Sequence, residues 1–217
     1  MLNNPESIVF VIGAVIMLVF AVLFFISRKH NSYFTAAFLV SSVTLVSYLV
    51  MLEGSLAGVY SSGNFVYYSR WLFYIGSCSI LMLSIAKLLD LPRKNLLPVI
   101  ILNVLVMLSG AIAAVLTDEF KWILFGAGTL FFIGQLFLLF ENSKPGKTRA
   151  MVIYYIIFGW AIFPIVFFLA PEGLGLISNL WAVSIYLALD IFTKIVFYLH
   201  LDLVVTKKKP AIEKSKP

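Results

Sequence analysis

Seven long apolar stretches run through the chain, and short polar breaks separate them. They lie at about residues 7–27, 33–52, 65–89, 96–116, 122–140, 151–170 and 177–205. Each stretch is close to the roughly 20 residues that a helix needs to cross a bilayer. None alternates strictly between apolar and polar positions, which argues against a membrane β-barrel. Because a helix satisfies its own backbone hydrogen bonds in lipid, the pattern predicts an all-α bundle of seven transmembrane helices.

The composition excludes a water-soluble globule. Of the 217 residues, 62% are hydrophobic and 12% are charged, whereas soluble domains are about 45–50% apolar and about 25% charged. The single cysteine, Cys78, excludes an internal disulfide framework and a multi-cysteine metal site. Neither a nucleotide-binding loop nor a hydrolase triad is recognisable, so we expect no enzyme and no metal centre. The composition is typical of a multi-pass protein of the cell membrane.

The charged residues predict how the bundle is oriented. The first, third and fifth polar breaks are basic, and the other breaks are mostly acidic. The basic residues are Arg28, Lys29, Arg93, Lys94, Lys144, Lys147 and Arg149. By the positive-inside rule these breaks face the cytoplasm, which places the N-terminus outside the cell and the C-terminus inside.

Two segments are expected along the chain. Residues 1–206 form the transmembrane domain, and residues 207–217 form a basic, disordered cytoplasmic tail. The net charge of +6 is then a signal of membrane orientation and of attraction to anionic lipid, not of nucleic-acid binding.

Three ionisable residues lie deep in the predicted spans, where a charge is costly and is a functional candidate. Arg70 lies in the outer third of the third span, and Asp190 and Lys194 lie near the middle of the seventh. Their spacing of four residues places Asp190 and Lys194 on one helix face. An ion pair that only holds helices together stabilises weakly, because desolvation offsets its attraction. We favour Lys194 as an amine held in an apolar pocket for Schiff-base chemistry, with Asp190 as its counterion.

A lysine in the last of seven helices, with an aspartate one turn before it, resembles the microbial rhodopsins. The sixth span contains the run WAIFP at residues 160–164, which is similar to the family's Trp-x-x-aromatic-Pro element. Arg70 looks like the arginine that gates the extracellular half of these proteins. The resemblance implies all-trans retinal bound to Lys194, with Asp190 as the counterion and Trp160 packed against the polyene.

The third span is similar to one branch of this family. Three residues after Arg70, where outward proton pumps have an aspartate, this chain has Phe73, and the run from Arg70 to Cys78 is most similar to the schizorhodopsins. That branch carries Phe, Ser and Glu at three key positions, pairs an asparagine (here Asn103) with the cysteine, and pumps protons inward. The residues that the resemblance assigns to the retinal site are Lys194, Asp190, Trp160, Phe163, Pro164, Tyr74, Phe73, Ser77, Cys78, Asn103 and Trp122.

One position departs from that branch. Ser84 stands where the schizorhodopsins have the glutamate that assists proton release to the cytoplasm. It follows Phe73 by roughly 16 Å of helix, so we expect it near the inner mouth, on a transport path that begins at Arg70. A serine bridges water but holds no negative charge, and the positive charge of Lys87 one turn further on opposes a proton that leaves there.

Three other ionisable residues lie toward the same side and are candidates to replace the glutamate through water. They are Asp90, His200 and Asp202. The simpler interpretations are a loop carboxylate, an interfacial histidine and a solvated carboxylate at a helix end, respectively. Lys87 is most simply a side chain that snorkels toward the headgroups.

The leading hypothesis is a light-driven inward proton transporter. Phe73 cannot accept the Schiff-base proton, and Asp190 is the only carboxylate that the sequence places beside it. The alternative, motivated by Ser84, is a photosensor or a very weak pump. An anion pump is disfavoured because Phe73 fills the place where a small polar residue supports a halide. The heliorhodopsins are a further relative, but they are inverted in the membrane, and the basic breaks of this chain argue against that orientation. The expected partners are retinal, membrane lipid, protons and further copies of the chain, with a trimer favoured and no nucleic acid.

Overall fold

A computed structural model describes residues 4–54, 59–61, 64–141 and 143–206. Within these residues, seven helical spans are long and apolar enough to cross a membrane, which confirms the predicted architecture. The first five are α1 (Pro5–Ser27), α2 (Tyr33–Glu53), α3 (Ser69–Leu88), α4 (Arg93–Val115) and α5 (Phe120–Glu141). The sixth is divided into α6 (Lys147–Tyr155), η1 (Ile156–Trp160) and α7 (Ile162–Leu169), and the seventh into α8 (Asn179–Asp190), η2 (Ile191–Val196) and α9 (Phe197–Thr206). The tail predicted at 207–217 lies outside the described residues.

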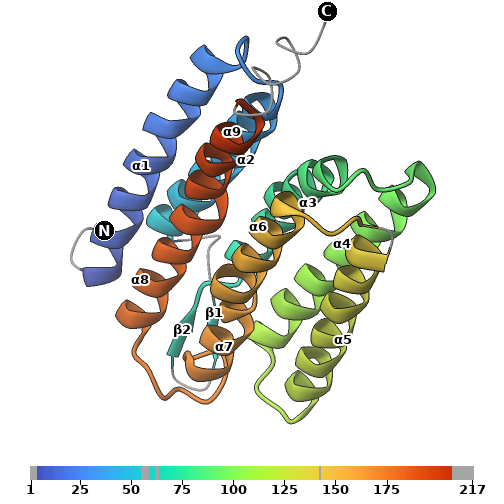
Figure 1. The fold of residues 1–217 in the computed structure, drawn as a ribbon. Helices are drawn as coiled ribbons and strands as arrows, with labels where there is room; N and C mark the ends of the chain where they lie inside the picture. The colour runs from blue at the N-terminus through green and yellow to red at the C-terminus, as the bar shows by residue number, and fades with distance from the viewer. Residues whose placement is uncertain (1–3, 55–58, 62–63, 142, 207–217) are drawn as a thin grey trace, which may run out of the picture.

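The helices pack mainly against their neighbours in the chain. Contacts run in series from α1 to α5, and α1 also contacts α8, which brings the first and last spans side by side (Figure 1). The outward faces are apolar: on α5, Leu130 and Phe137 are 69% and 65% exposed. Apolar side chains are stable in contact with lipid, whereas polar side chains there are costly. The polar side chains therefore point inward, toward the centre of the bundle.

A short hairpin precedes the third span. Strands β1 (Val59–Ser61) and β2 (Asn64–Val66) pair antiparallel, and the side-chain amide of Asn179 donates a 2.6 Å hydrogen bond to the carbonyl of Phe65. The prediction of a helix from about residue 65 is therefore wrong at its start. The backbone of residues 64–66 is satisfied by strand pairing, and α3 begins at Ser69.

Charge separates the two ends of the bundle. The α1–α2, α3–α4 and α5–α6 connections carry the basic residues and lie together at the upper end of Figure 1, here called the basic end. The α2–α3, α4–α5 and α7–α8 connections lie at the lower end, here called the acidic end. Lys121 is a basic residue at the acidic end, and its ammonium donates a 2.9 Å hydrogen bond to the carbonyl of Gly173. The segregation of charge that the sequence predicts is thus present in three dimensions.

Two π-helical segments, η1 and η2, interrupt the sixth and seventh spans at the same depth. They approach closely where Gly159 meets Thr193, because a Cβ at residue 159 would lie 2.5 Å from Thr193 Cγ2. π-Helical segments insert an extra residue per turn and re-aim the side chains that follow. Here they carry Trp160 and Lys194, two of the residues that the resemblance assigns to the retinal site.

Candidate functional site

The centre of the bundle contains a buried ion pair. Lys194 Nζ lies 2.7 Å from Asp190 Oδ1, and both side chains are 1% exposed. Although the atoms are close, their angles are not those of a hydrogen bond, so the carboxylate lies beside the amine and not in line with an N–H bond. The four-residue spacing read from the sequence therefore corresponds to a direct contact across the junction of α8 and η2.

Asp190 has further partners from α2 and α3. The phenol of Tyr48 donates to Oδ2 over 2.8 Å, and that of Tyr74 donates to Oδ1 and Oδ2 over 2.8 and 2.9 Å. Arg70 Nη1 lies 4.0 Å from Oδ2. Hydrogen bonds to a charged group are stronger than neutral ones and offset its desolvation. Two cations and two hydroxyl groups thus hold one carboxylate, and the cluster carries an excess positive charge.

Tyr48 was not a candidate in the sequence, because a single tyrosine in an apolar helix carries no distinguishing signal. Its ring is fully buried against α1. A Cβ at Gly13 would lie 2.7 Å from the ring, so the glycine provides the space that the tyrosine occupies. The pair Gly13 and Tyr48 is the sequence feature from which this contact could have been found.

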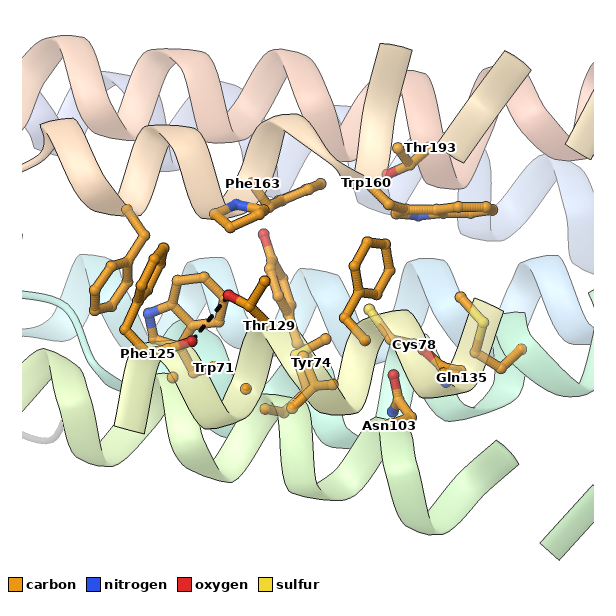
Figure 2. Close-up of a pocket in the computed structure, with 18 of the residues that line it drawn as sticks. Trp71, Tyr74, Cys78, Asn103, Phe125, Thr129, Gln135, Trp160, Phe163 and Thr193 are labelled. Atoms are coloured by element: carbon orange, nitrogen blue, oxygen red, sulfur yellow. Dashed lines mark hydrogen bonds between the residues drawn. The ribbon is translucent and has the colours of Figure 1, made fainter. Parts of the chain in front are cut away.

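An apolar cavity extends from Lys194 between α3, α4, α5 and the sixth span. The empty volume between its side chains is about 850 Å³, including space open to the exterior. Figure 2 shows Trp160 and Phe163 on one side of it, with Tyr74 and Cys78 facing them. Asn103 and Gln135 are among the few polar side chains of the wall. Such a cavity suits a long apolar ligand that ends at the amine.

Most residues assigned to the retinal site line this cavity. They are Lys194, Trp160, Phe163, Pro164, Tyr74, Cys78 and Asn103. Asp190 lies behind Lys194, as its ion-pair partner.

Three assigned residues lie outside the cavity wall. The Ser77 hydroxyl, fully buried, donates to the carbonyl of Phe73 over 3.3 Å. Phe73 precedes Tyr74 in the helix, and the turn of about 100° per residue directs its ring elsewhere. Trp122 packs against Phe168, with ring centroids 5.5 Å apart, near the beginning of α5. Phe73, Ser77 and Trp122 are thus not among the residues that line the cavity, and their assignment to the retinal site remains a prediction.

The predicted pairing of Asn103 with Cys78 is also absent. The Asn103 amide donates to Ser79 Oγ over 2.9 Å. Cys78 is buried, at 6% exposed, and faces the cavity. Asn103 thus ties α4 to α3 one residue further along than the resemblance implies.

Much of the cavity wall carries no signal in the sequence, above all the part that comes from α4 and α5. Trp71, adjacent to Arg70, also lines the cavity and makes an edge contact with Phe167 at 5.6 Å. A Cβ at Gly110 would lie 3.1 Å from the Trp71 ring. The other missed wall residues are Met82, Val106, Met107, Leu124, Phe125, Gly128, Thr129, Phe132, Gln135, Phe167 and Thr193. These residues resemble lipid-facing ones in sequence, so only small residues such as Gly110 could have signalled the wall.

Arg70 connects the ion pair to the acidic end. Its guanidinium is 2% exposed and lies 4.6 Å from the centre of the Tyr186 ring. The Tyr186 phenol donates over 3.1 Å to Oε1 of Glu172, which lies in the α7–α8 connection and is 8% exposed. Burial raises the pKa of the Glu172 carboxyl above its ordinary value, although Tyr186 and Arg70 favour its charged form. A buried acid therefore lies on this side of the site, which the acidic character of the polar break alone does not predict.

Ser84, on the other side of the ion pair, does not lie at an open mouth as expected. It is 5% exposed, and its hydroxyl lies 2.9 Å from the phenol of Tyr198 and 3.1 Å from the carbonyl of Ile80. Tyr198 is fully buried. The path toward the basic end is therefore closed by a pair of hydroxyl groups.

The remaining candidates lie nearer the surface of the basic end. Lys87 is exposed, with its ammonium 5.3 Å from the centre of the Tyr33 ring. His200 is exposed, and its Nδ1 lies 3.3 Å from the Tyr155 phenol. Asp90 is exposed, with a positive φ of 54°. Their positions agree with the simpler interpretations of these residues.

The site fits a chromophore attached to the lysine. A primary amine at the wall of an apolar cavity can condense with an aldehyde, and Asp190 would balance the charge of the protonated product. Trp160 Nε1, also at the wall, is buried without a hydrogen-bond partner. An apolar ligand that packs on this indole ring offers no hydrogen-bond acceptor to Nε1, so the wall is consistent with a polyene.

Comparisons with known proteins agree with this geometry. A family model described as bacteriorhodopsin-like protein matches residues 4–207. The crystal structure of schizorhodopsin 4 is 35% identical, with a TM-score of 0.85 over 91% of this chain and 98% of that chain. That of the thermophilic rhodopsin from Rubrobacter xylanophilus is 26% identical, with a TM-score of 0.82 over 90% and 94%. Sensory rhodopsin-2 of Natronomonas pharaonis is 27% identical over 212 residues, 91% of this chain and 88% of that relative. The chain therefore belongs to the bacteriorhodopsin-like family of microbial rhodopsins, which are light-driven retinal proteins of the cell membrane.

Proposed function

We propose that this chain is a light-driven transporter that moves protons inward, from the acidic end, outside the cell, to the basic end, in the cytoplasm. The observation that carries the proposal is the state of Asp190. Its two oxygens already accept hydrogen bonds from Tyr48 and Tyr74 and face Lys194. A carboxylate stabilised in this way is a poor proton acceptor.

The residue three positions after Arg70 supports the same direction. Phe73 has no group that binds a proton, and it lies outside the cavity wall. Among the described residues, Asp190 is the carboxylate in contact with Lys194. A proton that leaves the lysine nitrogen therefore finds no free carboxylate beside it on the acidic side, and release toward the basic end is favoured.

Lys194 would hold all-trans retinal, which would supply the absorption of light and the isomerisation that drives the cycle. The chain supplies the rest. Asp190 stabilises the protonated form before illumination, and Trp160 and Phe163 confine the polyene. Arg70, whose Nη1 lies 4.0 Å from Asp190 Oδ2, adds a second positive charge that favours the charged carboxylate.

A second candidate function is a photosensor or a very weak pump. It is favoured by Ser84, because a hydroxyl bonded to Tyr198 lies where a carboxylate would accept the proton. The relative described as sensory rhodopsin-2 is consistent with this alternative. A sensor completes its photocycle with negligible net proton movement, so the two candidates differ in flux.

The test is the pH of an unbuffered suspension of cells that contain the protein and retinal. Inward transport makes the external medium alkaline in light, and a protonophore abolishes the signal. Lys194→Ala is the control, since it should be colourless and silent. Acidification would reverse the direction, and an unchanged pH in a coloured protein would favour the sensor. Absorption that depends on chloride would favour an anion pump instead.

We also infer from the family resemblance that the protein forms a homo-oligomer, with a trimer favoured. The broad apolar faces of the bundle, such as that of α5, are compatible with helix packing between copies in lipid. Mass measurement of the protein in a nanodisc or after cross-linking in the membrane gives the number of copies.

A further inference from the structure

Four polar residues of the seventh span repeat at intervals of four: Asp190, Lys194, Tyr198 and Asp202. Residues four apart lie above one another on a helix face. The column extends over about 18 Å, from the ion pair to the basic end. Its first two members form the site already described, and the last two have no role in it.

Tyr198 lies at the centre of the bundle, beyond the cavity. Its phenol lies 2.9 Å from the Ser84 hydroxyl, whose own O–H donates to the carbonyl of Ile80 over 3.1 Å, so the phenol is the donor of the pair. The ring is held by edge contacts with Phe24 and Phe197, at 6.3 and 5.3 Å between centroids. A hydroxyl group both donates and accepts, so the pair can pass a proton when the Ser84 O–H turns from Ile80 to Tyr198.

Apolar side chains enclose this hydroxyl pair. Leu81 of α3 lies about one turn before Ser84 and Ile85 follows it directly, and both are fully buried. The Ser84–Tyr198 pair is thus a polar contact between α3 and the seventh span within apolar surroundings.

Asp202 is positioned, and is not simply a solvated carboxylate at a helix end. The side-chain amide of Asn31, in the α1–α2 connection, donates to Asp202 Oδ1 over 2.8 Å. Asn31 is itself fixed, because its Oδ1 accepts the backbone N–H of Tyr33 over 3.0 Å, and it is 8% exposed. The carboxylate is half-buried. It therefore has one side held by protein and another within reach of the solution.

We propose that Tyr198, with Ser84, and Asp202 form the proton exit of this chain. They would replace the glutamate that the schizorhodopsins have at the position of Ser84. In the exit step one hydroxyl oxygen of the pair gains a proton as the other loses one, so the pair is unchanged. Asp202 gains the released proton as a carboxylic acid and then loses it to the solution. Asp202 follows Tyr198 by about one helical turn, and water would carry the proton between the two groups. This inference rests on the proposed inward transport and names its exit residues.

The test compares Tyr198→Phe and Asp202→Asn with two matched controls in illuminated cells. Tyr154→Phe removes an exposed phenol of the neighbouring span, and Asp90→Asn neutralises an exposed carboxylate at the same end, where asparagine tolerates the positive φ. Loss of a positioned acid or base costs at least about tenfold in rate. We expect that loss in the initial rate of alkalisation for the two exit variants and none for the controls. Asp202→Glu keeps a carboxylate at this position, so it should transport protons where Asp202→Asn does not.

A second readout does not depend on flux. The infrared difference spectrum of wild-type protein during illumination should contain a carboxylic-acid carbonyl band that Asp202→Asn removes and Asp90→Asn leaves. Retinal absorbance and the melting temperature report whether each variant folds. If wild-type protein transports and both exit variants match the controls, the exit proposal is wrong while the proposed function stands. If coloured wild-type protein moves no protons, the proposed function is contradicted, and the exit with it.

Discussion

Tyr48 reaches from α2 to the seventh span and donates a 2.8 Å hydrogen bond to Oδ2 of Asp190, so that residues 142 apart in sequence form one buried polar contact. The contact depends on a third helix. Gly13 of α1 leaves the space for the Tyr48 ring. The surroundings of the counterion thus depend on α1 and α2 as well as on Tyr74 of α3, and not on the Asp190–Lys194 pair alone.

Removal of this hydroxyl tests its contribution. Tyr48→Phe keeps the ring but deprives Asp190 of one donor. A hydrogen bond to a charged group contributes about 1.5–3 kcal/mol, and we expect a destabilisation of that size. With less of its charge engaged, the carboxylate binds the retinal linkage more strongly, which should shift absorption to shorter wavelength. Thermal bleaching and the absorption maximum measure both effects, and Tyr154→Phe should change neither. An unshifted, equally stable Tyr48→Phe protein would show that Tyr74 alone suffices.

The close approach of the two π-helical segments predicts a strongly non-additive pair of substitutions. In Gly159→Ala the new methyl group would lie 2.5 Å from Thr193 Cγ2. Overpacking of this kind costs about 1–3 kcal/mol. Thr193→Ser removes Cγ2 but keeps the hydroxyl that donates to the carbonyl of Leu189 over 2.7 Å.

The double variant should therefore lose less free energy of unfolding than the two single variants lose together, with a coupling energy of about 1 kcal/mol or more. A double-mutant cycle on thermal bleaching measures it. Additive free energies would mean that the backbone of η1 moves away instead, and that this contact does not fix the helices.

The seven spans could be predicted from hydropathy because lipid leaves the backbone almost no alternative to a helix. The Asp190–Lys194 contact followed from the geometry of one helix, in which residues four apart share a face. Errors arose where a second helix decides the outcome. The resemblance to the schizorhodopsins implied Cys78 as the partner of Asn103, whereas the relative positions of α3 and α4 bring Ser79 to the amide.

The cavity wall was the least predictable part of the site. Met107 and Phe125 are apolar residues in apolar helices, and their neighbours that face lipid have the same composition. Leu130 faces outward, for example, at 69% exposed, while Thr129 beside it lines the cavity. The π-helical segments add to the difficulty, because they shift the helix face on which a residue such as Lys194 appears. Periodicity read at 3.6 residues per turn cannot anticipate that shift.

Glu172 predicts a dependence of stability on pH. Burial raises the pKa of its carboxyl in the folded protein above the ordinary value of 4.5. As pH rises from about 4.5, the unfolded chain loses this proton first and the folded protein retains it, so unfolding becomes easier. The contribution of this carboxyl to stability is complete below about pH 4.5. It then declines as pH rises to the pKa of the carboxyl in the folded protein.

Glu172→Gln removes the titration and keeps an oxygen that accepts from Tyr186. The stability of the variant relative to wild-type protein should therefore rise with pH above about 4.5. Melting temperatures of the two proteins over a pH series give the difference, in which other titrating groups cancel. Glu119→Gln, an exposed acid at the same end, should show no such trend. A constant difference for Glu172→Gln would mean that the pKa of this carboxyl is the same in the folded and the unfolded protein.

Restoring a carboxylate at residue 84 distinguishes an efficient pump from a weak one. Ser84→Glu places an acceptor next to the Tyr198 phenol, in a position that is 5% exposed. A positioned proton acceptor is worth about tenfold or more in transfer rate. If release toward the basic end limits the wild-type cycle, alkalisation should rise by that order. Ser84→Gln has nearly the same shape without the charge, so it should not increase transport. Equal flux in wild type and Ser84→Glu would mean that the hydroxyl pair already passes the proton as fast as the rest of the cycle requires.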